Sequence, residues 1–188
     1  MRVARSTGIC TIWTRRSSAP ISTLPVPAET ARSGGEAQAR EALGRSQGGF
    51  STKLHLRAEG NGKPIAAVLT GGERHEQIAL EALLDQGAIR RPGRGRPRLR
   101  PRQAAGDKGY SSPTARRHLR RRHIRAVIPS KSNQRRQPNF DRAAYRRRNL
   151  VERLINRLKQ VRRIATRYEK RATNYLAMVH IGMVLLWL

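Results

Sequence analysis

Residues 145–168 place a single carboxylate within a basic stripe on a predicted helix, and this pattern limits the folds open to the chain. Apolar residues recur at three- and four-residue steps, which predicts a helix with one buried side: Val151, Leu154, Ile155, Leu158, Val161, Ala165 and Tyr168. At about 100° per residue, four residues fall within roughly 40° of Glu152: Tyr145, Arg148, Lys159 and Arg163. The alternative interpretation is a surface helix on which Glu152 pairs with Arg148, worth about 0.3–0.5 kcal/mol.

The rest of the chain predicts alternating strands and helices. Gly49–Arg57 alternates as a strand does, Pro64–Thr70 is a second strand, and Asn61-Gly62 predicts a hairpin turn between them. We expect these two strands to pair antiparallel. The further predicted elements are a helix over His75–Gln86, a strand over Gln103–Gly106, a basic helix over Thr114–His123, a strand over Ile124–Pro129, one long helix from Asn139 or Asp141 to about Lys170, and a closing helix over Asn174–Trp187.

Charge points to a polyanionic partner. The chain of 188 residues has 40 Lys and Arg against 12 Asp and Glu, a formal net charge of +28. Such an excess favours nucleic acid, and an aromatic content of only 4% argues against a single-strand binder that stacks bases. The partner that these observations favour is therefore double-stranded DNA, bound through its backbone.

Two carboxylates stand where metal-dependent phosphodiester chemistry would need them. Asp107 follows a predicted strand, and Glu152 lies on the predicted helix, so that only the fold could bring them together. Two divalent ions about 4 Å apart can stabilise the attacking and leaving oxygens of a phosphodiester, and Mg²⁺ prefers carboxylate oxygens. The alternative for Asp107 is a turn residue before Lys108-Gly109.

From Gly34 to Leu188 the sequence resembles the catalytic domain of a bacterial insertion-sequence transposase of the DDE class. Three stretches carry the resemblance: Ala42–Lys53 (Ala-Leu-Gly-Arg-Ser-Gln-Gly-Gly-Phe-Ser-Thr-Lys), Gly106–Tyr110 (Gly-Asp-Lys-Gly-Tyr) and Asn149–Lys159 (Asn-Leu-Val-Glu-Arg-Leu-Ile-Asn-Arg-Leu-Lys). It implies an α/β fold, namely a ribonuclease H-like mixed sheet with flanking helices. It also implies DNA cleavage and strand transfer at transposon ends.

By this resemblance, Asp107 and Glu152 are the catalytic and metal-binding carboxylates for Mg²⁺ or Mn²⁺. The implied DNA contacts, at the transposon ends and the target, are Tyr145, Arg148, Lys159, Lys108 and Arg163. The basic segments Arg90–Arg102 and Arg116–Arg125 would add contacts to the DNA backbone. An oligomer with itself or with an intact transposase is left open.

The amino-terminal part departs from the family. The family's first metal-binding aspartate should end a strand, yet the chain has no aspartate before Asp85. We therefore expect residues 1–33 to be irregular, disordered or out of frame, and residues 34–188 to be a partial catalytic domain that lacks its first strand. Metal binding would then be weakened and cleavage lost.

A reading-frame shift would explain this departure. Trp13 is encoded by TGG and Thr14 begins with AC, so the shifted frame must contain GAC, an aspartate codon. With suitable codons, the following residues can read Ala-Thr-Ile-Val-Arg-Ala-His, which resembles the family's first-aspartate motif. We hypothesise that this segment is a transposase gene read out of frame.

Two other functions stay open. A DNA-binding protein without catalysis could occupy transposon ends or inhibit intact subunits, and a basic structural protein of a ribonucleoprotein would explain the charge but not Asp107 and Glu152. The single Cys10 excludes an internal disulfide, no export signal is recognisable, and the apolar stretch Tyr175–Leu188 is shorter than the roughly 20 residues that span a bilayer. We expect a cytoplasmic protein that does not bind membranes.

Overall fold

A β-hairpin is the starting point of the sheet. In the computed structural model, which describes residues 9–17, 40–46, 49–89, 94–135 and 137–188, β3 (Gly49–Ala58) pairs antiparallel with β4 (Pro64–Gly71). Gly62 has a φ of +84° in the connecting turn, a conformation that suits glycine. The predicted antiparallel hairpin is confirmed.

The other edge of β3 pairs with a strand from the amino-terminal part of the chain. Strand β1 (Ile9–Ser17) runs antiparallel to β3, with Trp13 opposite Leu56, and parallel to β5 (Gln103–Ala105), with Thr11 opposite Ala105. The expectation that the sheet lacks a strand ahead of β3 is therefore wrong. Residues 9–17 fill that position, because β3 and β5 both offer them a free edge for backbone hydrogen bonds.

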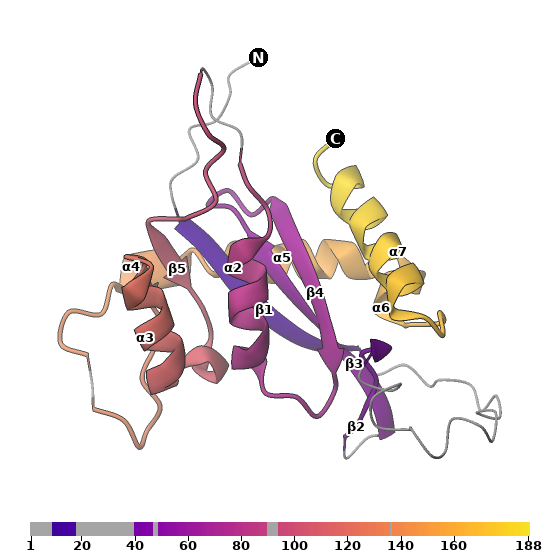
Figure 1. The fold of residues 1–188 in the computed structure, drawn as a ribbon, viewed down its shortest axis with the longest axis horizontal. Helices are drawn as coiled ribbons and strands as arrows, with labels where there is room; N and C mark the ends of the chain where they lie inside the picture. The colour runs from indigo at the N-terminus through magenta and orange to yellow at the C-terminus, as the bar shows by residue number, and fades with distance from the viewer. Residues whose placement is uncertain (1–8, 18–39, 47–48, 90–93, 136) are drawn as a thin grey trace.

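The sheet is mixed, and helices cover both of its faces (Figure 1). Strand β6 (Arg125–Val127) adds parallel to β5, and β2 (Gly44–Ser46) pairs antiparallel with the start of β3. The predicted α/β class with flanking helices is confirmed. The proposed separate segment 1–33 stays a prediction, because residues 1–8 and 18–33 lie outside the described part.

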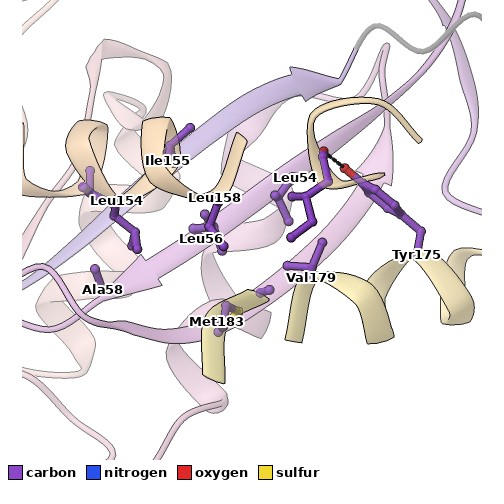
Figure 2. Packing of buried hydrophobic residues seen from close by; sticks show 12 residues of the cluster. Leu54, Leu56, Ala58, Leu154, Ile155, Leu158, Tyr175, Val179 and Met183 are labelled. Carbon is purple, nitrogen blue, oxygen red and sulfur yellow. Dashed lines mark hydrogen bonds between the residues drawn. The ribbon is translucent and has the colours of Figure 1, made fainter. Parts of the chain in front are cut away.

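The strand alternation of the hairpin divides the core between the two faces. Leu54 and Leu56 of β3 pack on one face against α5 (Asn149–Lys159) and α7 (Ala172–Leu185), together with Val179 (Figure 2). On the opposite face, Ala66 of β4 packs with α2 (Ala79–Asp85) and α3 (Pro113–Arg121). Because successive side chains in a strand point to opposite faces, β4 contributes to both cores, with Ala66 on one face and Ala67 on the other, whereas β3 contributes apolar side chains to one core only.

The predicted long helix is divided into three in the structure. Asp141 caps α4 (Arg142–Arg146), its Oδ1 accepting from the Ala144 amide at 2.8 Å, as its sequence position predicted. The chain tightens at Arg147–Arg148 and enters α5, and it breaks at Val161, whose ψ is +105°, before α6 (Arg162–Ala165). One continuous helix to Lys170 is therefore wrong.

The carboxyl-terminal helix packs against the core of the protein. Helix α7 covers Ala172–Leu185, close to the predicted range, and Tyr175 and Val179 are buried in the core. Within the described residues, we find no helix with the length and apolar character needed to cross a bilayer.

Candidate functional site

Asp107 lies just beyond the end of β5 and begins a short 3-10 turn, η3 (Lys108–Tyr110). Its Oδ1 accepts a hydrogen bond from the Gly109 amide at 3.0 Å, so the turn fixes the direction of the carboxyl group. Burial raises the pKa of Asp107, the Gly109 hydrogen bond opposes this, the negative charge of Glu76 raises the pKa further, and the positive charge of Arg148 lowers it. A partly buried carboxylate close to another acid and to an arginine is typical of functional sites.

Glu152 lies in the first turn of α5 and is held by Arg148. Arg148 Nη2 lies 2.6 Å from Glu152 Oε1, and the side chains are 19% and 42% exposed. The same guanidinium acts electrostatically on Asp107. The structure thus brings the two predicted carboxylates to one basic side chain, although they are 45 positions apart in the sequence.

The aromatic ring of Tyr145 packs against the guanidinium of Arg148. The Arg148 guanidinium carbon lies 5.4 Å from the centroid of the Tyr145 ring, which contacts Phe140 at a centroid distance of 5.4 Å. Stacking on an aromatic face limits the conformations of a guanidinium and leaves its edge for hydrogen bonds. Tyr145 therefore positions Arg148 beside Glu152.

A buried polar network not anticipated from the sequence lies on the other side of Asp107. Lys53 of β3 is 6% exposed and its Nζ lies 3.0 Å from Glu76 Oε1, at the start of the 3-10 turn η2 (Glu76–Ile78). A Cβ on Gly109 would lie 3.0 Å from Asp107 Oδ1 and 3.3 Å from Glu76 Oε2, so both carboxylates border the same turn. Glu76 is therefore a third acid close to Asp107.

The charges in this network are set by burial and by pairing. Burial alone would raise the pKa of Glu76, but the hydrogen bond and positive charge of Lys53 bring it below its usual value. Burial lowers the pKa of His55 to about 4, with Glu76 opposing and Lys53 adding to the shift. His55 is therefore neutral near pH 7, with its Nε2 2.7 Å from Thr70 Oγ1. The one sequence signal for the network is the alternation of Lys53, His55 and Arg57 along β3.

The other three predicted DNA contacts, Lys108, Lys159 and Arg163, lie at different places relative to the two carboxylates. Lys108 is exposed beside Asp107, and Lys159 lies in the last turn of α5, two turns beyond Glu152 on the same face. Arg163 lies on α6 after the break at Val161, and its Nε is 3.5 Å from Glu169 Oε1. The helical-wheel argument that placed Arg163 beside Glu152 is wrong, because it required one continuous helix.

Carboxylate oxygens suit Mg²⁺ or Mn²⁺ in chemical type. In the described ranges, however, we find no group of three or more His, Cys, Asp or Glu side chains arranged to hold a metal ion. The Glu152 carboxylate forms an ion pair with Arg148, and the Glu76 carboxylate forms one with Lys53. The geometry thus offers two separated carboxylates at one surface, with basic groups beside each.

Sequence comparison decides the family. The profile described as "Transposase DDE domain" matches residues 23–187. The chain belongs to this family. The match includes Asp107, Arg148 and Glu152, so the resemblance seen in the sequence is confirmed.

Two similar proteins are named as transposases of insertion sequence elements. A candidate transposase for insertion sequence element IS402 of Burkholderia cepacia is 35% identical over 135 residues, which cover 72% of this chain and 62% of that protein. A candidate transposase for insertion sequence element IS6501 of Brucella ovis is 28% identical over 144 residues, which cover 74% of this chain and 99% of that protein. The chain thus spans less than two thirds of the Burkholderia relative.

Proposed function

We propose that this chain is a fragment of an insertion-sequence transposase whose family reaction is metal-dependent cleavage and strand transfer of DNA at transposon ends. The observation that carries the proposal is Arg148, which lies 2.6 Å from Glu152 and acts electrostatically on Asp107. One guanidinium between two signature carboxylates is a natural place for a DNA phosphate, since it can form hydrogen bonds in pairs. Tyr145 limits the motion of this guanidinium, and Lys108 and Lys159 add positive charge on either side.

Asp107 and Glu152 would hold Mg²⁺ or Mn²⁺, and Arg148 would have to leave Glu152 as the ion binds. Divalent ions at such a site stabilise the attacking and leaving oxygens of the phosphodiester. The chain's own part is to orient the Asp107 carboxyl through the Gly109 amide and to hold neighbouring phosphates on Arg148 and Lys159. Glu76 is paired with Lys53, so Asp107 and Glu152 alone are fewer than the three carboxylates that two ions require. Metal binding is therefore weakened, and the chain is inactive alone.

Strand β1 supports a ribonuclease H-like fold and a specific place for the absent carboxylate. The strand order β4-β3-β1-β5-β6 has β1 antiparallel to β3 and parallel to β5. Thr11 stands opposite Ala105, so the same parallel register continued by two residues brings Trp13 level with Asp107. The shifted frame places its aspartate codon across Trp13 and Thr14. Register and codons thus point to the same position, which supports a frame shift as the cause of the missing carboxylate.

The test is cleavage and strand transfer on a labelled transposon-end duplex with Mg²⁺ or Mn²⁺. Four proteins are compared: the chain, its Glu152→Gln variant, a version with the shifted frame restored ahead of Gly34, and the restored version with Glu152→Gln. We expect activity only in the restored version with Glu152 intact. Activity of the unrestored chain that depends on Glu152 would overturn the proposed inactivity. Absence of both DNA binding and activity in all four would overturn the transposase function.

The alternative is a DNA-binding protein that has lost catalysis and inhibits intact subunits. The net charge of +28 and the incomplete carboxylate set favour it over an unrelated function. Adding the chain to the restored protein separates the two proposals. Inhibition that exceeds simple competition for DNA would indicate mixed oligomers, whereas no inhibition at saturating DNA would leave a remnant that binds DNA alone.

A further inference from the structure

A basic hollow lies between α3 and the loop residues 130–135 and 137, outside the site described above. Its volume is about 550 Å³, and four arginines line it: Arg116, Arg117, Arg120 and Arg135. Arg117, Arg120 and Arg135 are exposed, and Arg116 is partly buried. In the described residues, none of the four has a carboxylate within ion-pair distance.

The surrounding sequence offers this charge no compensation. Residues 108–140 contain ten Lys or Arg and no Asp or Glu. A concentration of positive charge around a concave surface attracts anions more strongly than the same charges spread over a convex one. The hollow therefore fits a partner that is itself strongly negative.

Hydrogen bonds within the protein hold the walls of the hollow. Gln134 Oε1 accepts from Ser111 Oγ at 2.6 Å, and Gln134 Nε2 donates to the Ser111 carbonyl oxygen at 2.5 Å. Arg116 Nη2 donates to Ser111 Oγ at 3.0 Å and to the Ile128 carbonyl oxygen at 2.9 Å, which ties α3 to the start of the loop. Because these contacts hold the walls in place, binding needs little reorganisation there.

The hollow also adjoins the candidate site. Ser111, which is hydrogen-bonded to the lining residues Gln134 and Arg116, follows η3 directly and is four residues after Asp107. A strand of DNA whose phosphate approaches Asp107 would therefore have its next phosphates close to α3. Among the lining residues there is no aromatic side chain to stack a base and no large apolar side chain to enter a lipid layer.

We propose that α3 and loop residues 130–135 and 137 form a second DNA-binding surface, which holds backbone phosphates of duplex DNA flanking the reacting phosphate. Positive charge comes from Arg117, Arg120 and Arg135. The hydrogen bonds of Arg116 and Gln134 hold the walls of the hollow in place. This inference rests on the proposed function, since it assumes that DNA approaches Asp107.

The test is the salt dependence of duplex DNA binding, measured by fluorescence anisotropy without metal. The variant with Arg117→Gln and Arg120→Gln is compared with a control that carries Lys170→Gln and Arg171→Gln. Lys170 and Arg171 are exposed residues between α6 and α7, and their replacement removes the same amount of charge. Each phosphate contact contributes about 0.9 to the slope of log K against log salt, so the hollow variant should lose about 1.8. At 0.1 M salt we expect it to bind roughly 10- to 100-fold more weakly.

The control pair should keep the wild-type slope, and Arg117→Lys with Arg120→Lys should keep most of it. Equal slopes for the hollow and control pairs would overturn the inference, as would an effect confined to RNA or to anionic lipid vesicles. If Arg148→Gln weakens binding while the hollow variant binds as wild type, the inference alone fails. If the wild type does not bind duplex DNA, the proposed function fails with it.

Discussion

Arg148 Nη2 lies 2.6 Å from Glu152 Oε1, one helical turn away, and the positive charge of the same guanidinium opposes the rise that burial causes in the pKa of Asp107. In a surface helix this would be an ordinary pair of residues four positions apart, worth a few tenths of a kcal/mol. Here the arginine also acts electrostatically on a second carboxylate, Asp107, from a different part of the chain. This second effect is the reason that we propose a site here and not only a stabilising contact on a helix.

Replacing Arg148 should strengthen the binding of a divalent cation. In Arg148→Gln, the positive charge that pairs with Glu152 and acts on Asp107 is lost, so the guanidinium no longer repels a cation or competes with it for the Glu152 carboxylate. Allowing for solvent screening of the partly exposed Glu152, we expect Mn²⁺ to bind about tenfold more tightly, as measured by electron paramagnetic resonance. Arg153→Gln, an exposed neighbour on α5, is the control and should change little. Weaker binding in Arg148→Gln would show that the arginine does not compete with the metal.

Asp107→Asn should stabilise the fold at neutral pH. The folded pKa of Asp107 is raised, so its charge disfavours the native state, and the cost disappears as the pH falls below the unfolded pKa. Asparagine can still accept from the Gly109 amide. Urea unfolding at pH 7 should therefore show a higher free energy of unfolding for the variant, and at pH 3.5 the difference should vanish.

The matched control for this change is Asp141→Asn, because Asp141 also caps a helix with its Oδ1. It should bring no gain at pH 7. A loss of stability in Asp107→Asn at pH 7 would mean that the carboxylate charge favours the fold.

Local sequence pattern predicted most elements, because they depend on short-range periodicity. The hairpin, both parallel strands after it, the basic helix and the cap at Asp141 all follow from alternation, turn residues or capping. The break at Val161 could not be predicted in this way, because the apolar spacing continues through Ile164. It depends on α7: Tyr175 Oη donates to the Ile164 carbonyl oxygen at 2.8 Å, and a Cβ on Gly182 would lie 2.4 Å from Ile164 Cδ1.

The site was predicted in part for the same reason. Asp107, Glu152, Arg148 and Tyr145 belong to spaced motifs, and the fold brings them to one place. Lys53 ends the first of the three stretches that resemble the family, but that stretch predicted no role for it, and Glu76 belongs to no such motif. The two residues are 23 positions apart, in β3 and η2. Their pairing can be recognised only in the fold, where η2 and α2 bury that face of β3. A charged residue in an alternating strand predicts the strand but not what covers it.

His55 should make the fold acid-labile at mildly acidic pH. Its pKa falls from 6.5 to about 4 on burial, so the unfolded state binds the proton first. The stability that this group contributes is complete above pH 6.5 and is lost as the pH falls towards 4, at a total of about 3 kcal/mol. Urea unfolding of His55→Gln should show a flatter pH profile over this range. His180→Gln, on an exposed face of α7, should keep the wild-type slope, and an unchanged slope in His55→Gln would contradict the assignment.

Arg57→Met should destabilise the protein strongly. Arg57 is 1% exposed, and its guanidinium donates to the carbonyl oxygens of Leu83, Leu84 and Gln86 at the end of α2 and to that of Leu99. Methionine fills the space but leaves these buried acceptors without a donor, so we expect a loss of roughly 3–5 kcal/mol in the free energy of unfolding. Arg100→Gln on the surface should stay within about 0.5 kcal/mol. Arg57→Lys should lose less stability than Arg57→Met and more than Arg100→Gln, because one ammonium cannot reach the carbonyl oxygens of α2 and Leu99 together. A loss equal to that of Arg57→Met would show that the fork geometry of the guanidinium, and not its charge, maintains these contacts.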